Sequence, residues 1–146
     1  MRHLLPACAM FLALSACLPG SETPQASADP LPPESSFAVL EIDGQPAPPG
    51  TSFELSANDE ISGQAPCNRY RAQLTRGDAG ISIGMGISTR MACLDDSLTR
   101  AETQMLAALP EITGASAGPG AGQVALTDAS GATRLLLEPQ AGSAAP

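Results

Sequence analysis

Cys67 and Cys93 are the side chains with the most reactive chemistry in the central part of this sequence. They would close a loop of about 25 residues, and in an oxidising compartment such a disulfide typically stabilises a small domain by ~3–4 kcal/mol. Alternatively, both stay reduced and pack as small hydrophobic side chains. A catalytic thiol is not expected, because neither cysteine has a histidine or lysine beside it to lower its pKa.

Acidic side chains offer a second possible chemistry. Asp59-Glu60 and Asp95-Asp96 are adjacent carboxylate pairs, which we interpret as turn and helix-start residues. The alternatives are a hydrolase that uses carboxylates alone, or a calcium site. The single histidine is His3, at the N-terminus, which excludes Ser-His-Asp and Cys-His systems and His-ligated metal sites. We therefore expect no enzymatic activity, no catalytic residue, no metal and no cofactor.

The N-terminal residues predict export and lipid attachment. Residues 1–16 combine a positive start with a short apolar run and small residues, the pattern of a secretory signal peptide. Leu14-Ser15-Ala16-Cys17 resembles the bacterial lipobox, whose cysteine receives the lipid. Because Leu18 rather than an aspartate follows, we expect Cys17 to anchor the protein in the outer membrane, facing the periplasm. The alternative is an ordinary signal peptide that is cleaved elsewhere.

Composition divides the rest of the chain and limits its partners. Residues 17–35 are rich in Pro and Ser and predict a tether, residues 36–139 predict one domain, and residues 140–146 predict a disordered tail. The formal net charge is −8, and all seven basic residues are arginines. Such a surface repels phosphate backbones, so nucleic acid is excluded as a partner. The expected partners are the membrane, through the lipid, and an envelope protein or a small ligand.

The hydrophobic pattern predicts short strands and one helix. Alternating or apolar runs between turn residues predict strands at 37–42, 51–56, 60–64, 70–75, 81–83, 112–115, 123–127 and 133–138. A helix is expected to begin near Asp95 and to end at Pro110, with Thr99 and Glu102 at the spacing of a capping box. The predicted fold class is α+β, a mostly antiparallel meander or partial barrel with one α-helix packed on it.

Three ordered motifs carry a resemblance to a known family. Gly63-Gln64-Ala65-Pro66-Cys67-Asn68-Arg69-Tyr70 is followed by Ile87-Ser88-Thr89-Arg90-Met91-Ala92-Cys93 and then by a helix with an early Glu102. Over residues 36–138 this order resembles the META domain of HslJ-like bacterial lipoproteins. Phe37 stands where that family usually has Trp, and Ala72 and Leu74 replace a glycine and an aromatic residue. The resemblance implies a compact, mostly antiparallel domain with one helix, and a cell-envelope role linked to stress tolerance without established catalysis.

The motif residues suit either structure or recognition. Asn68 can hydrogen-bond turn backbone, and Arg69 and Arg90 can pair with carboxylates or carbonyls at the same edge. The alternative is that this edge, together with Tyr70 and Thr89, recognises a ligand or a protein. The expected function is that of a lipid-anchored, non-catalytic envelope protein with a structural, interaction or stress-tolerance role. A small-molecule-binding module is the alternative, and a carboxylate-based hydrolase is the third reading.

Overall fold

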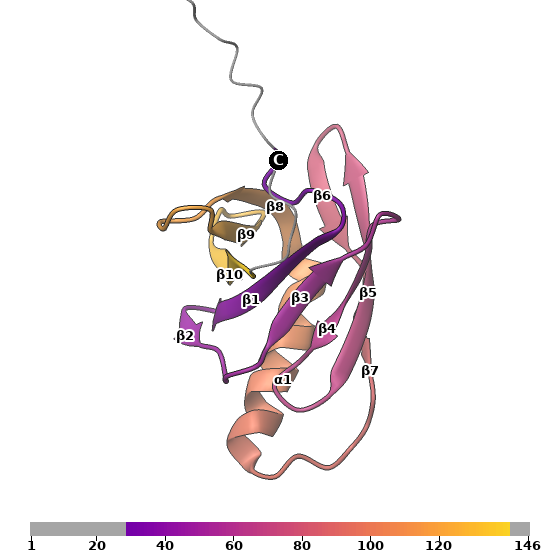
Figure 1. Cartoon of the computed structure of the whole chain (residues 1–146), viewed down its shortest axis with the longest axis vertical. Helices are drawn as coiled ribbons and strands as arrows, with labels where there is room; N and C mark the ends of the chain where they lie inside the picture. Colours follow the sequence, from indigo (N-terminus) through magenta and orange to yellow (C-terminus); the bar gives the residue numbers. More distant parts are fainter. Residues whose placement is uncertain (1–28, 141–146) are drawn as a thin grey trace, which may run out of the picture.

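A computed structural model describes residues 29–140 of the chain (Figure 1). This part of the chain contains ten strands and one α-helix, and the predicted α+β class is confirmed. The strands are β1 (Ser35–Ile42), β2 (Gln45–Pro46), β3 (Ser52–Leu55), β4 (Glu60–Gln64), β5 (Arg69–Gly77), β6 (Gly80–Ile83), β7 (Ile87–Ser88), β8 (Ile112–Ala117), β9 (Val124–Asp128) and β10 (Thr133–Pro139). The helix α1 (Asp96–Ala108) continues into a short 3₁₀ turn, η1 (Leu109–Glu111).

The strands form one antiparallel sheet that nearly closes into a barrel. Their order is β6-β5-β4-β3-β1-β10-β9-β8, with β2 paired to β1 and β7 paired to β5. The two ends of this order, β6 and β8, lie next to each other. Gly80 of β6 has a φ of +129°, and a Cβ there would lie 2.5 Å from the carbonyl oxygen of Thr113 in β8. A side chain at this position would therefore obstruct the closure.

The inward face of each strand builds the core. Along β5, Tyr70, Ala72 and Leu74 are buried whereas their neighbours Arg69 and Arg71 are exposed, which confirms the predicted alternation. Phe37 and Phe53, on the paired strands β1 and β3, meet edge to face with ring centroids 6.4 Å apart. Aliphatic side chains supply most of the remaining core, as expected for a chain in which aromatic residues are 3% of the total.

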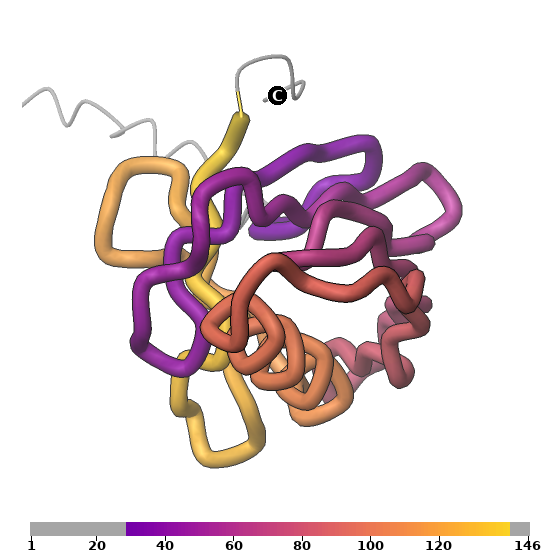
Figure 2. The backbone as a smooth tube through the Cα atoms, turned by 90° about the horizontal axis from the view of Figure 1, so that it is seen from below, coloured from indigo at the N-terminus to yellow at the C-terminus, as the bar shows by residue number. Residues whose placement is uncertain are grey.

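The helix packs against the sheet through a narrow buried stripe. Its buried residues are Glu102, Met105 and Ala108, and the element contacts β1 and β10. In the view from below, the strands curve around this helix (Figure 2). Asp95 is the N-cap and accepts hydrogen bonds from the next backbone N–H groups. The predicted capping box of Thr99 and Glu102 is wrong, because the helix begins earlier and the Glu102 carboxylate points toward another loop. Among residues 29–140, no helix combines the length and apolar character needed to cross a bilayer.

The folded domain begins before the expected boundary at residue 36. Leu31 is fully buried in the core, and Asp29 forms an ion pair with Arg76, with Oδ2 2.7 Å from Nη1. A second nitrogen of Arg76 donates to the carbonyl oxygen of Leu31 at 2.7 Å. Residues 29–35, which the composition assigned to the tether, thus pack on the domain. At the other end, the Gln140 N–H donates to Ser36. The predicted signal peptide, Cys17 and residues 141–146 lie outside the described residues.

Two very short strands were not predicted. β2 and β7 contain two residues each, too few for an alternating pattern to show in the sequence. β7 pairs with the beginning of β5, with Tyr70 opposite Ser88 and Arg71 opposite Ile87. The N–H of Thr89 extends this pairing by donating to the carbonyl oxygen of Arg69 at 3.0 Å. β7 therefore continues the sheet edge beyond β6 and brings residues 87–93 beside the β4–β5 loop.

Candidate functional site

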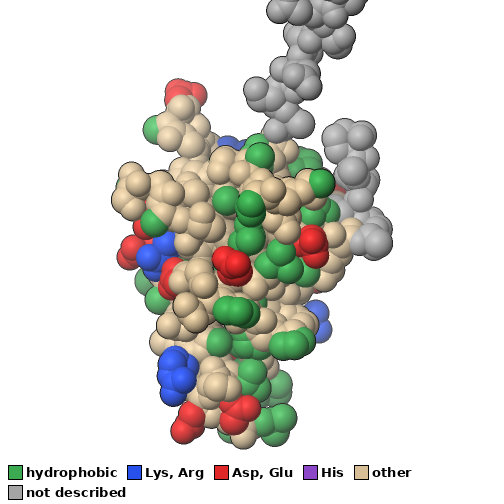
Figure 3. All heavy atoms as spheres, turned by 90° about the vertical axis from the view of Figure 1, so that its left-hand side faces the viewer, with side chains coloured by type: hydrophobic (Ala, Val, Ile, Leu, Met, Phe, Trp, Pro, Cys, Tyr) green, Lys and Arg blue, Asp and Glu red, His purple; other side chains and the backbone are tan. Residues whose placement is uncertain are grey.

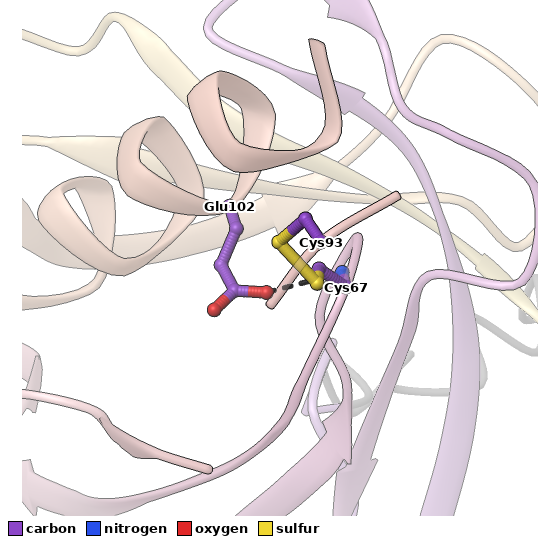
Figure 4. Close-up of side chains that lie close together, drawn as sticks. All are labelled: Cys67, Cys93 and Glu102. Carbon is purple, nitrogen blue, oxygen red and sulfur yellow. Dashed lines mark hydrogen bonds between the residues drawn. A yellow bond between two sulfur atoms is a disulfide. The ribbon is translucent and has the colours of Figure 1, made fainter. Parts of the chain in front are cut away.

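The cysteines join the β4–β5 loop to the segment that leads into the helix. Cys67 and Cys93 form a disulfide, with Cα atoms 5.6 Å apart, and the expected pairing is present (Figure 4). Cys67 lies between the paired strands β4 and β5, whereas Cys93 lies two residues before the N-cap Asp95. The disulfide joins these two segments beside the first residue of β5, Arg69.

Glu102 adds a polar clamp at the same place. Its side chain projects from α1 toward the disulfide (Figure 4). Oε2 accepts from the backbone N–H of Cys67 at 3.0 Å and of Asn68 at 2.7 Å, and Oε1 accepts from Asn68 Nδ2 at 2.9 Å. The residue is 8% exposed, so a carboxylate without these donors would be costly. Hydrogen bonds to an ionised acceptor are stronger than neutral ones. Glu102 therefore fixes the loop to the helix.

Asn68 connects this clamp to residues 89–91. Its Oδ1 accepts from the Thr89 hydroxyl and from the Met91 N–H, both at 2.9 Å. Its Nδ2 donates to Glu102 and, at 3.4 Å, to the carbonyl oxygen of Met91. The amide is thus bonded on both of its ends, and its orientation is determined by its partners. Of the two readings of Asn68 made from the sequence, the contacts favour the structural one.

The cluster of Cys67, Cys93 and Glu102 has no free ligand atoms for a metal ion in its oxidised form. The sulfur atoms of Cys67 and Cys93 and a carboxylate oxygen of Glu102 lie within 4.8 Å of one another, close enough to hold a metal ion. However, the two sulfurs are bonded to each other, and metal ligation requires thiolates. Both Glu102 oxygens already accept N–H donors. In its oxidised form, this cluster acts as a structural clamp.

Tyr70 lies inside the domain rather than on an exposed edge. Its ring is 2% exposed, and its hydroxyl donates to the carbonyl oxygen of Ser52 at 3.1 Å. Burial, followed by the nearby Glu54 charge, raises the pKa of Tyr70 far above its usual range, so the hydroxyl stays protonated. Gly63 lies opposite Tyr70 in β4, and a Cβ there would overlap the Ser52 carbonyl. Of the two readings that the sequence left open, these contacts of the Tyr70 side chain favour the structural one.

The arginines of the predicted edge are exposed. Among residues 29–140, neither Arg69 nor Arg90 takes part in an ion pair, so of the carboxylate and carbonyl partners considered from the sequence, the carboxylates are not found. Arg71, two residues along β5, points to the same outer face as Arg69 and lies 3.6 Å from Glu60. Sequence reasoning missed Arg71, although the alternation along β5 placed it beside Arg69. Thr89 is exposed, and its hydroxyl donates to Asn68 Oδ1.

Two adjoining surface pockets lie along residues 87–93. The first has a volume of about 450 Å³ and is bordered by Arg69, Arg71 and Ile87. The second has a volume of about 410 Å³ and is bordered by Arg90 and Met91. Both are lined by Ser88 and Thr89, and we call the two pockets together the edge groove.

The acidic pairs have structural partners. Asp95 caps the helix, and the hydrogen bonds from Ser97 and then from the Leu98 N–H lower its pKa. Asp59 forms an ion pair with Arg76, with Oδ1 2.9 Å from Nε. Glu60 lies on the exposed face beside Arg71. These carboxylates therefore have the helix-start and turn roles that the sequence predicts.

A nearly closed antiparallel barrel with one helix, clamped by a disulfide and a buried glutamate, defines a class of small β-domain proteins. The META domain model matches residues 29–141, and the chain belongs to this family. An NMR structure of a protein from Burkholderia xenovorans is 27% identical, with a TM-score of 0.58, covering 74% of this chain and 83% of that one. A second NMR structure, at 18% identity and a TM-score of 0.55, covers 72% of this chain and 88% of its own and shares the fold. Comparison with curated proteins gave no match.

Proposed function

We propose that this META-family chain is a lipid-anchored envelope protein that works by binding rather than by catalysis. The proposal rests on one observation: the reactive and polar groups of the motif residues are bonded to one another inside the domain. Cys67 and Cys93 are bonded to each other, and Glu102 and Asn68 are saturated by internal hydrogen bonds. Such groups hold a surface in place but have no free nucleophile or base to act on a substrate. A structural, interaction or stress-tolerance role follows from this proposal.

The lipid anchor rests on the sequence around Cys17. A single acyl chain binds a membrane only weakly, whereas two or more give a stable anchor, and bacterial lipoproteins carry two or three. Outer-membrane attachment facing the periplasm would also account for the disulfide, since that compartment is oxidising. Mass spectrometry of the protein from separated membrane fractions tests this address. The expected result is an acylated N-terminal Cys17 with Cys67 and Cys93 oxidised; a soluble form that retains residues 1–16 would contradict it.

A small-molecule-binding module is the second candidate. The edge groove favours it, because a volume of about 450 Å³ falls within the range of ligand sites. A thermal-shift screen of small anions and amphiphiles tests this candidate, and a stabilised hit lost in the Arg71→Ala variant would favour it. A carboxylate-based hydrolase is tested with Asp95→Asn and Asp96→Asn variants. If the chain shows hydrolytic activity and both variants retain it in full, these carboxylates are not catalytic and the hydrolase hypothesis is wrong.

The role itself is tested by deletion in the host. Growth under heat, antibiotic and detergent stress is compared between the deletion strain, the strain complemented with the whole gene and the strain complemented with a Cys17→Ser variant. The proposal expects a defect that the whole gene rescues and the unanchored variant rescues poorly. Equal growth of all strains under every stress would count against an envelope-stress role.

A further inference from the structure

We propose that the edge groove docks an extended, acidic segment of a partner protein, which adds to the free side of β7. The partner segment presents carboxylates and aliphatic side chains on the same face. This inference rests on the proposed binding function and adds the chemistry of the partner. Three independent features of residues 69–93 support it: charge, exposed apolar side chains and an unpaired strand edge.

The charge of the groove opposes the charge of the chain. The whole sequence carries a formal net charge of −8, yet Arg69 and Arg71 border one pocket of the edge groove and Arg90 borders the other. The contrast is with Arg76 and Arg134, whose guanidinium groups are held in ion pairs with aspartates. The contact of Arg71 with Glu60 is long and solvent-exposed, and such pairs contribute little. The guanidinium groups at the groove are therefore available to a carboxylate from outside.

Apolar side chains are exposed along the same segment. Ile87 is 72% exposed and Met91 is 65% exposed, and each borders one of the two pockets. Met85 and Leu94 extend this exposure on either side. Together with Ile87 and Met91, they are the large hydrophobic residues that stand out as exposed among residues 29–140. An exposed apolar patch rimmed by polar residues is typical of an interaction site.

The backbone of β7 offers a place for a strand. β7 pairs with β5 on one side, and within the described residues no strand pairs with its other side. An unpaired edge is a template for an extended peptide, whose alternate side chains point to the same face. On the outer face of this edge Arg71 lies opposite Ile87 in the register, so a peptide that has both a carboxylate and an aliphatic side chain on that face meets complementary groups.

The position of the groove suits a tethered protein. Asp29, where the described chain begins, is paired with Arg76 near the end of β5, whereas Arg69 opens the same strand. A strand of this length spans about 25 Å. Figure 1 shows the described chain beginning at the top, with β7 and the loop into α1 near the bottom. At this lower end, hydrophobic, acidic and basic side chains are seen together on the face shown in Figure 3. A domain held through its N-terminus would present the groove away from the membrane.

The test is fluorescence anisotropy with the purified protein, with or without acylation at its N-terminus. The probe is a labelled, end-blocked peptide with a repeated Asp-Ser-Val-Ser sequence, which puts Asp and Val on the same face of a strand. The control peptide has Lys in place of Asp. We expect saturable binding of the acidic peptide alone, weakened at least tenfold in the Arg69→Glu/Arg71→Glu variant and by added salt. The matched control is Arg100→Glu, an exposed arginine on α1 outside the groove, which should bind as the unmodified chain does.

Several results would overturn the inference. These are failure to bind the acidic peptide, equal binding of the basic peptide, or equal weakening by Arg100→Glu. Tighter binding to phosphatidylglycerol vesicles than to the peptide would identify a membrane surface instead. Self-association lost in the Arg69→Glu/Arg71→Glu variant would identify a second copy of the chain as the occupant. Because the peptide assay does not depend on acylation, a missing lipid would contradict the proposed anchoring and leave this inference standing.

Discussion

Replacing Glu102 by glutamine tests whether a buried carboxylate holds the domain together. In the native chain its two oxygens accept three N–H groups, at 2.7, 2.9 and 3.0 Å. Glutamine has the same shape but one oxygen and one NH₂ group, so a donor must face a donor in either orientation. Asn68 cannot relieve the conflict by turning its amide over, because its Oδ1 already accepts from Thr89 and Met91.

The expected loss follows from the bonds involved. With its oxygen toward the two backbone N–H groups, glutamine retains two weaker, neutral hydrogen bonds. Its NH₂ group then faces Asn68 Nδ2, which keeps only the 3.4 Å bond to the Met91 carbonyl oxygen. Hydrogen bonds to a charged group contribute about 1.5–3 kcal/mol, and an unsatisfied buried donor costs about 1–3 kcal/mol. We therefore expect Glu102→Gln to lower the free energy of unfolding by about 2–4 kcal/mol. This is a large part of the ~5–15 kcal/mol that stabilises a typical domain.

Urea unfolding at neutral pH with the disulfide intact measures this loss. The unfolding midpoint should fall by about 1–2 M, using a slope of about 2 kcal/mol per M. The matched control is Glu111→Gln, which removes the same charge from an exposed residue of η1. If Glu102→Gln differs from this control by less than about 0.5 kcal/mol, a typical limit for surface substitutions, the carboxylate does not clamp the loop.

Three further changes probe the same half of the domain. Cys67→Ala/Cys93→Ala should lower the free energy of unfolding by ~3–4 kcal/mol, measured in urea; no change would mean that the bond constrains nothing. Gly63→Ala should cost at least about 2 kcal/mol in thermal unfolding, because its Cβ would overlap the Ser52 carbonyl, and a neutral result would refute that close approach. Asp95, whose pKa is lowered in the folded state, contributes stability above the unfolded pKa of about 3.9 that is lost as pH falls through the folded value. Asp95→Asn should therefore flatten the stability curve below about pH 4, and an unchanged acid limb would contradict the assignment.

Local patterns predicted the strands well. The alternation of Tyr70, Ala72 and Leu74 fixed one face of β5, and the run Glu60–Gln64 was predicted with the bounds that the structure has. Asp95 was predicted as a helix-start residue because its type and position satisfy a purely local rule. In each of these cases, the information lies within a few neighbouring positions of the chain.

The candidate site was only partly predictable, because its contacts join distant segments. Glu102 lies 35 residues from Cys67, and local rules assigned it to a capping box that does not form. The same limit applies to Tyr70, whose hydroxyl donates to Ser52, a residue 18 positions away in the chain. The sequence placed Arg69 and Arg90 near each other only through the motif, and β7, which brings them to one groove, is too short to predict.

The clamp and the groove belong together physically. Residues 87–93 contain only a two-residue strand, and such a segment would ordinarily be mobile. Here it is held by the bonds of Asn68 at Met91 and by the disulfide at Cys93, while β5 pairs with Ile87. A strand edge that is already ordered loses less conformational entropy when a partner strand binds. The affinity is therefore higher without any new contact. On this reasoning the buried motif residues act at a distance from the partner: they keep the exposed Arg and aliphatic side chains in the geometry that binding requires.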